Sequence, residues 1–136
     1  MKKILVFNAH YFPGFLSGGI ARTILNTSDW LSKDYDFFIV AKDRDLGDKY
    51  PYPNIELKKW NVYGKSKVRY LAPNELSFSS IKDLINKSNY DFIHLNSCYD
   101  IFFTLKVVIL ARLGLIKSKI ILSPRGEFVE DVMKIK

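Results

Sequence analysis

The sequence predicts a single α/β domain in which a mostly parallel sheet carries helices on both faces. Short apolar runs rich in β-forming residues alternate with stretches whose apolar residues recur every three or four positions. The first run, Ile4 to Phe7, is unbroken, as is typical of a strand buried on both faces. The chain has 136 residues, 48% hydrophobic and 26% charged, which is enough for one ordinary folded domain with a core.

The first unit joins the strand at Ile4 to Phe7 to a helix that begins after the paired glycines Gly18 and Gly19. Ile20 and Ile24 open the apolar face of this helix. A strand, a glycine turn and a helix start form an arrangement that binds phosphate, because glycine permits close approach and the helix dipole favours negative charge. From this element alone a simple tight connection between strand and helix is favoured, because the spacing matches neither a dinucleotide-binding motif nor a P-loop.

The remaining elements follow in order along the chain. Further strands are expected at Phe37 to Ala41, Ile55 to Trp60, Val68 to Leu71, Asp91 to Leu95 and Lys119 to Leu122. Helices are expected at Ser77 to Lys87 and Tyr99 to Leu115, and the tail from Val129 resembles the start of another. Loop or turn is expected at Lys42 to Pro53 and at Asn61 to Lys65, where Gly and Pro interrupt the pattern.

Three distinctive stretches lie at the carboxyl ends of predicted strands. They cover residues 8–19, 96–99 and 123–127. In parallel sheets ligands bind beyond these ends, at the point where the strand order reverses. The sequence therefore predicts a binding site at this edge of the sheet.

The charge balance predicts attraction to an anionic partner. The chain has 21 Lys and Arg against 14 Asp and Glu, a net charge of +7. The densest basic stretch, Lys58 to Tyr70, is interleaved with Trp60 and Tyr63. We interpret it first as a solvated face and second as a contact with an anionic membrane. Nucleic acid ranks last, because no recognised nucleic-acid motif is present.

The cysteine and histidine content argues against a disulfide-stabilised protein and against a metal-binding protein. The single cysteine, Cys98, permits no disulfide within the chain and fits a reducing cytoplasm. Two distant histidines and one cysteine offer no metal-ligand spacing, so no metal site is expected. The apolar run behind Met1 is too short for a signal peptide. The apolar segment Ile101 to Leu115 is too short to span a bilayer, and Lys106 and Arg112 interrupt it.

Four stretches carry a resemblance to a known family. They are the opening strand, Tyr-Phe-Pro through Gly-Gly at 11–19, Phe-Ile-His-Leu-Asn at 92–96, and Ser-Pro-Arg-Gly-Glu-Phe at 123–128. In this order and spacing they resemble the amino-terminal domain of GT-B-fold glycosyltransferases, in particular family 4. The resemblance covers Lys2 to about Phe128. It implies a Rossmann-like, doubly wound sheet and a retaining transfer of a sugar from a nucleotide-sugar donor to a glycan or lipid-linked acceptor.

The resemblance also implies roles for particular residues. Gly18 and Gly19 would meet the donor diphosphate. The acceptor-side cleft would contain Asn8, His10, Asn96, Ser123, Arg125, Gly126 and Glu127. The donor is a substrate, so no separate cofactor is implied. Relatives often carry a histidine, credited with assisting the reaction, where this chain has Arg125. An arginine cannot be a base at neutral pH, so no catalytic residue is assigned. Arg125 could bind a phosphate or carboxylate, or pair with Glu127 or Glu130.

A carboxyl-terminal nucleotide-sugar domain, with its characteristic pair of glutamates, has no counterpart in the sequence. Residues 1–136 are therefore expected to be one half of an enzyme, which needs a missing domain or a partner subunit. We expect the chain alone to be inactive. The expected location is the cytoplasm, with peripheral attachment at the inner face of the membrane as an option.

Two other functions stay open. One is a non-catalytic α/β binding module that docks on a partner or an anionic membrane. The other is half of a sugar-nucleotide epimerase. A transferase half predicts an exposed apolar or mixed face where the other domain would sit, whereas an independent module predicts a polar surface.

Overall fold

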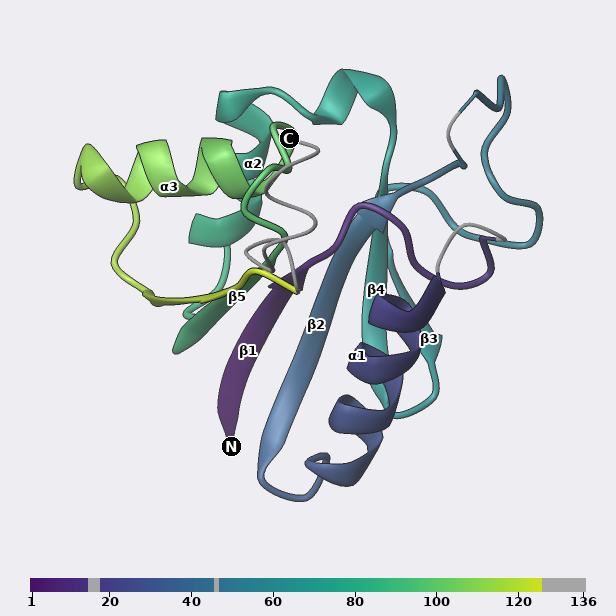
Figure 1. The fold of residues 1–136 in the computed structure, drawn as a ribbon, viewed down its shortest axis with the longest axis horizontal. Coiled ribbons are helices and arrows are strands. Elements are labelled where there is room, and N and C mark those ends of the chain that lie inside the picture. The colour runs from purple at the N-terminus through teal and green to yellow at the C-terminus, as the bar shows by residue number, and fades with distance from the viewer. Residues whose placement is uncertain (15–17, 46, 126–136) are drawn as a thin grey trace, which may run out of the picture.

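A computed structural model of the protein describes residues 1–14, 18–45 and 47–125 (Figure 1). They form one α/β domain with a six-stranded, mostly parallel sheet and three α-helices, which confirms the predicted class. The strands are β1 (Lys2–Phe7), β2 (Tyr35–Lys42), β3 (Trp60–Tyr63), β4 (Ser66–Leu71), β5 (Phe92–Asn96) and β6 (Lys119–Ser123). The helices are α1 (Gly18–Trp30), α2 (Phe78–Asn86) and α3 (Thr104–Arg112), with a short 3₁₀ turn η2 (Pro73–Glu75).

The strand order across the sheet is β3-β4-β2-β1-β5-β6. All neighbouring strands are parallel except β3, which pairs antiparallel with β4. From β1 the chain passes through β2 to the outermost strand β3 and folds back as β4 beside β2. It then crosses to the other side of β1 to form β5 and β6. The order of strands therefore reverses between β1 and β5, where Phe7 lies opposite Leu95.

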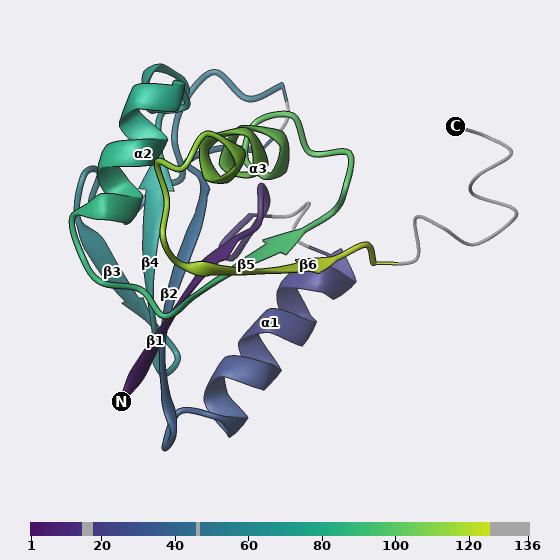
Figure 2. The ribbon, with the colours of Figure 1, turned by 90° about the vertical axis from the view of Figure 1, so that its left-hand side faces the viewer.

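The helices lie on both faces of the sheet (Figure 2). Side chains of β1 alternate between the two layers. Leu5 and Phe7 join the core beneath α2 and α3, whereas Val6 packs with Ala21 and Ile24 of α1. Because each central strand is covered on both faces, it needs no polar side, which explains the unbroken apolar run that the sequence shows.

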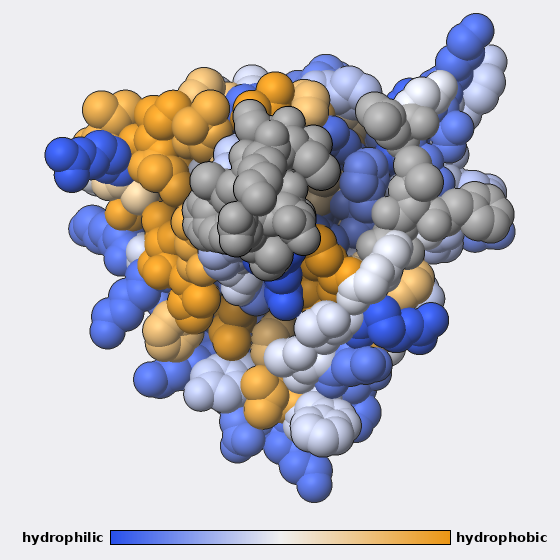
Figure 3. Space-filling view, viewed as in Figure 1, coloured by the Kyte–Doolittle hydropathy of each residue, from blue (hydrophilic) through white to orange (hydrophobic). Residues whose placement is uncertain are grey.

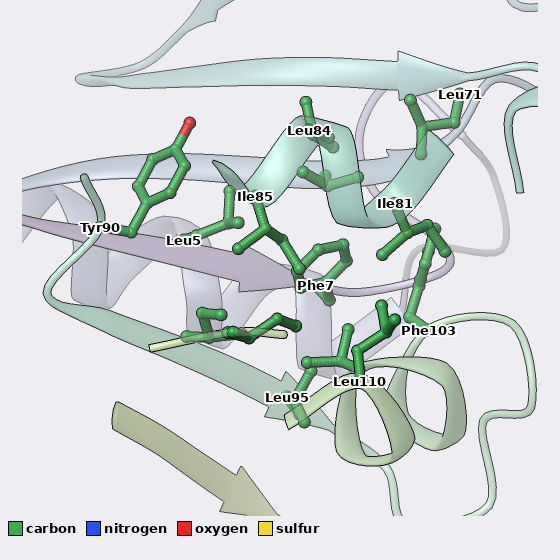
Figure 4. Packing of buried hydrophobic residues seen from close by; sticks show 14 of the residues in the cluster. Leu5, Phe7, Leu71, Ile81, Leu84, Ile85, Tyr90, Leu95, Phe103 and Leu110 are labelled. Carbon is green, nitrogen blue, oxygen red and sulfur yellow. The ribbon is translucent and has the colours of Figure 1, made fainter. Parts of the chain in front are cut away.

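The core beneath α2 and α3 fixes the carboxyl ends of β1 and β5 (Figure 4). Phe7 packs against Phe103, with 5.2 Å between ring centroids. Ile81 of α2, Leu110 of α3 and Leu95 of β5 belong to the same buried cluster. The residues that follow β1 and β5 are thus attached to closely packed apolar side chains.

The expected strand at Ile55 to Trp60 is wrong. Asn54 and Lys58 have φ angles of 61° and 62°, a left-handed conformation that is incompatible with an extended strand. The strand β3 begins only at Trp60 and pairs with β4 as a hairpin, with Tyr63 opposite Ser66. The expected turn at Asn61 to Lys65 is correct only around Gly64, whose φ is 61°.

The helix expected at Tyr99 to Leu115 begins at Thr104 and ends at Arg112. Its start is delayed because the Asp100 carboxylate accepts the backbone N–H groups of Phe102 and Phe103, at 2.9 and 3.2 Å. This side chain holds the segment before α3 as turns. The further helix expected from Val129 lies outside the described residues.

Candidate functional site

Asn96 joins three segments at the point where the strand order reverses. It is the last residue of β5 and its side chain is buried. Its Nδ2 donates to the backbone oxygen of Phe7 on β1, at 3.1 Å. Its Oδ1 accepts a hydrogen bond from Nε of Arg125, beyond β6, at 2.8 Å. One amide therefore uses both its donor and its acceptor to tie the ends of β1, β5 and β6 together.

Arg125 lies at the surface of this edge. Its φ of 56° is unusual for a residue other than glycine, and such conformations persist where the surroundings hold them. Among the described residues, Nε is its one hydrogen-bonded nitrogen, and Asn96 is the partner. The guanidinium carries its charge at neutral pH and presents donors in a fixed plane, so it can bind an anionic oxygen group.

The side chain of Ser123 is hydrogen-bonded within the sheet. Its Oγ lies 2.7 Å from Nε2 of His94 on the neighbouring strand. Burial, and secondarily the charge of Arg125, lower the pKa of His94 below its ordinary value. His94 is therefore neutral at neutral pH. His94 is thus a satisfied histidine on a sheet face, with Ser123 as its partner.

Asn8 and His10 lie in the segment that follows β1. Asn8 donates from Nδ2 to the backbone oxygen of His10 at 2.6 Å, which shapes this segment. The pKa of His10 is lowered first by burial and then by Lys42, while Asp45 and Asp100 oppose the shift. Nδ1 of His10 is buried and has no hydrogen-bond partner among the described residues. A neutral imidazole is thus held at the edge of the sheet.

Lys42 is a residue of this edge that the sequence did not single out. It ends β2, and its backbone N–H donates to the Ala9 oxygen at 3.0 Å. Its Nζ lies 3.5 Å from the centroid of the Phe102 ring, a cation–π contact between the end of β2 and the turns before α3. Burial lowers the pKa of Lys42. Lys42 directly follows the predicted strand Phe37 to Ala41, and this position could have identified it from the sequence.

Gly18 and Gly19 are the first two residues of α1, and both are exposed. Gly18 has a φ of 61°, which favours glycine. A Cβ built on either residue would meet nothing within 4 Å, so the space at this helix start is open. Because α1 runs back along the sheet, its start lies toward the carboxyl edge (Figure 1). The first N–H groups of a helix lack partners within it, and they can receive an anion.

Two predicted site residues, Gly126 and Glu127, lie outside the described residues. The same applies to the alternative pairing of Arg125 with Glu127 or Glu130. Within the described ranges, no group of three or more His, Cys, Asp and Glu side chains is arranged to hold a metal ion.

The basic stretch Lys58 to Tyr70 offers cations but few free aromatic rings. Tyr70 is buried, and the Trp60 ring packs edge-on against Phe38 with 5.2 Å between centroids. Lys67 places its ammonium 5.3 Å from the centroid of that same Phe38 ring. The aromatic residues therefore belong to the packing of the sheet.

A continuous apolar area covers the outer side of α3 and its neighbours, visible in orange at the upper left of Figure 3. We call it the α3 surface, and its exposed apolar residues are Ile101, Leu105, Val108, Ile109 and Leu113. Ile121 and Leu122 of the edge strand β6 are also exposed. Among the described helices, none combines the length and apolar character needed to span a membrane.

Comparisons with protein-family models, with curated proteins and with solved structures found no match to this chain.

Proposed function

We propose that the chain is the acceptor-side domain of a retaining glycosyltransferase with a GT-B fold, similar to family 4. It would help to transfer a sugar from a nucleotide-sugar donor to a glycan or lipid-linked acceptor. The observation that carries the proposal is the Asn96–Arg125 pair, which holds a guanidinium where the strand order reverses. Doubly wound, Rossmann-like sheets bind ligands at such a point.

The chemistry of the edge suits a phosphorylated donor and a hydroxyl acceptor. Arg125 can neutralise a phosphate oxygen, and the open helix start at Gly18 can donate N–H groups to the same diphosphate. His10 is neutral at neutral pH and can exchange a hydrogen bond with a hydroxyl group once the edge is occupied. Arg125 orients and neutralises charge, and it accepts no proton.

The α3 surface supports a transferase half over an independent polar module. Large exposed apolar areas on soluble proteins mark contacts with other structures. In the proposal, the nucleotide-binding half is supplied by a further domain or a partner subunit, and the isolated chain does not turn over. An epimerase half would share this arrangement. Attachment to the inner face of a membrane is part of the proposal only if the acceptor is lipid-linked.

A nuclear magnetic resonance titration tests the diphosphate role. The ¹⁵N-labelled chain is titrated with pyrophosphate, uridine diphosphate and uridine. We expect both diphosphates to shift the amide signals of Gly18 and Gly19 and the Nε–H signal of Arg125, whereas uridine shifts none of them. Arg125→Ala should weaken pyrophosphate binding by about tenfold or more, since hydrogen bonds to charged groups contribute that much. Arg112→Ala, an exposed arginine on α3, is the matched control and should bind unchanged.

Equal binding by Arg125→Ala and the parent chain would exclude the proposed role of Arg125. Sugar transfer by the purified chain alone, measured with a panel of nucleotide sugars, would contradict the assignment of a half site.

A further inference from the structure

A concave site lies beside the edge described above. It is a cavity of about 560 Å³ between the segment that follows β2, the hairpin strand β3 and Tyr70 of β4. Its lining includes Asp45, Asp48, Tyr50, Tyr52, Asn54 and Tyr63. A volume in this range accommodates a small organic ligand. No residue predicted to belong to the acceptor-side cleft lines it.

Buried hydrogen bonds hold one wall of the cavity in place. The Tyr52 hydroxyl donates to Oδ1 of Asp45 at 2.9 Å, and both side chains are buried. Burial, followed by this contact with Asp45, raises the pKa of Tyr52, so its hydroxyl remains a donor. The Tyr52 backbone N–H donates to the Asp43 oxygen at 2.8 Å. The wall is therefore formed before any ligand binds.

Gly14 fits against this wall. A Cβ at Gly14 would lie 2.4 Å from the Tyr52 hydroxyl oxygen and 2.6 Å from Oδ1 of Asp45. Only a residue without a side chain can pass this close to the pair without displacing it. The segment after β1 and the cavity wall are thus in direct contact, and the cavity adjoins the candidate site.

The charge of the lining selects against anions. Although the chain carries a net charge of +7, none of the described residues lining the cavity is a lysine, arginine or histidine. Two carboxylates, Asp45 and Asp48, lie in the lining instead. Diphosphates and other anions would be repelled, which separates this cavity from the edge around Arg125.

The aromatic lining presents flat apolar surfaces beside polar groups. Tyr63 stacks on Phe12, with ring centroids 5.5 Å apart and the planes 6° from parallel. Tyr52 meets Tyr70 edge-on at 6.0 Å. Tyr50 is 80% exposed at the mouth. Aromatic faces pack against the C–H faces of sugar rings, while carboxylate and amide oxygens accept hydrogen bonds from hydroxyl groups.

We propose that this cavity binds a neutral saccharide, as a subsite for a sugar of the acceptor some distance from the transfer point. The inference rests on the proposed function, which supplies the glycan acceptor. Tyr50 forms a stacking surface for one ring. Asp48 accepts hydrogen bonds from the hydroxyl groups of this ring, and the Asp45–Tyr52 pair forms the fixed wall.

The test uses the full 136-residue chain and four neutral disaccharides, namely maltose, lactose, mannobiose and N,N′-diacetylchitobiose. Binding is followed by chemical shifts of the Asp48, Tyr50 and Asn61 amides and by saturation transfer to the sugar. We expect at least one disaccharide to shift these signals. Tyr50→Ala and Asp48→Asn should each weaken its binding about tenfold, because one removes a stacking ring and the other a charged acceptor. Trp30→Ala changes an aromatic residue on α1 that is exposed like Tyr50 but lies outside the cavity, and it should leave binding unchanged.

Tetramethylammonium serves as a cationic probe, because aromatic rings and carboxylates also bind cations. Shifts with tetramethylammonium and with none of the four disaccharides would overturn the saccharide assignment, as would a lack of response to every probe. Pyrophosphate shifts at Gly18, Gly19 and Arg125 provide a separate readout. The two proposals can therefore fail separately. Disaccharide shifts without pyrophosphate shifts would contradict the proposed function alone, and pyrophosphate shifts without disaccharide shifts would contradict the saccharide site alone.

Discussion

Helices α2 and α3 share one face of the sheet and have nine residues each, but their outer sides differ. Both bury apolar residues inward, with Leu84 of α2 6% exposed and Leu110 of α3 4% exposed. On the outer side α2 carries the polar residues Ser79, Asp83 and Asn86 and one apolar residue, Phe78. On α3 the outer side carries Leu105, Val108 and Ile109. The outer side of α2 is therefore mostly polar. The outer side of α3 has the composition of a contact surface.

The largest expected effect is the loss of stability when a buried leucine of either helix is shortened. It tests whether α2 and α3 pack equally well against the core. Leu84→Ala and Leu110→Ala should each lower the free energy of unfolding by about 2–5 kcal/mol, because each leaves a cavity in the core. Leu113→Ala, at a position that is 67% exposed, should change it by less than about 0.5 kcal/mol. Urea unfolding measures all three. If Leu110→Ala costs as little as Leu113→Ala, α3 is not packed as described.

The next effect concerns how each helix begins. The Ser77 hydroxyl caps α2 by accepting the Ser80 N–H at 3.2 Å, whereas α3 depends on the Asp100 carboxylate before its first turn. Ser77→Ala and Asp100→Ala should each cost about 0.5–2 kcal/mol in unfolding free energy. Ser79→Ala is the control, because Ser79 is exposed in the first turn of α2 and is not the capping residue. Amide exchange should place the loss in α2 for the first variant and in α3 for the second.

A smaller effect depends on pH and comes from the sheet rather than from either helix. Burial lowers the pKa of His94 from its ordinary 6.5, so protonation favours the unfolded chain. Stability should be complete above pH 6.5 and should fall as the pH drops below it, with His10 contributing in the same direction. His94→Gln should reduce the loss between about pH 7 and about pH 5, measured as urea midpoints. If His94→Gln loses as much stability at acidic pH as the parent chain, groups other than His94 cause the loss.

The smallest expected change in stability accompanies a large change in association. The triple variant Leu105→Gln, Val108→Gln, Leu113→Gln should alter the free energy of unfolding by less than about 1 kcal/mol, because all three side chains are exposed. Sedimentation velocity should show less self-association than in the parent chain. Replacing Ser79, Asp83 and Asn86 of α2 by alanine is the matched control. If the parent chain, the α3 variant and the α2 variant self-associate equally, the outer side of α3 is no more a contact surface than that of α2.

The sequence predicted the regular parts of the fold because their signals are local. Buried strands such as Ile4 to Phe7 are continuous apolar runs, and α2 shows regular apolar spacing. The position of β3 was missed because the left-handed Lys58 interrupts the apparently extended stretch from Ile55 to Trp60. The start of α3 was missed because a single carboxylate, Asp100, redirects the backbone.

The candidate site was predictable only in part. Strand ends identified Asn96 and Arg125, but no pattern shows that one amide contacts both β1 and the residue after β6. One wall of the tyrosine-lined cavity contacts Gly14, which is far from Tyr52 in the sequence. Such contacts arise from tertiary packing, which periodicity does not encode. The roles proposed for Gly18, Gly19 and the acceptor-side residues remain predictions.

The α3 surface and the net charge of +7 also determine how copies of the chain behave toward one another in solution. Like charges repel over a distance set by the ionic strength, about 30 Å at 0.01 M but about 8 Å at 0.15 M. Apolar attraction acts only at contact and is not screened. In dilute buffer, repulsion keeps copies apart before their α3 surfaces can meet. In concentrated salt that barrier disappears, so ionic strength controls the colloidal stability of this domain.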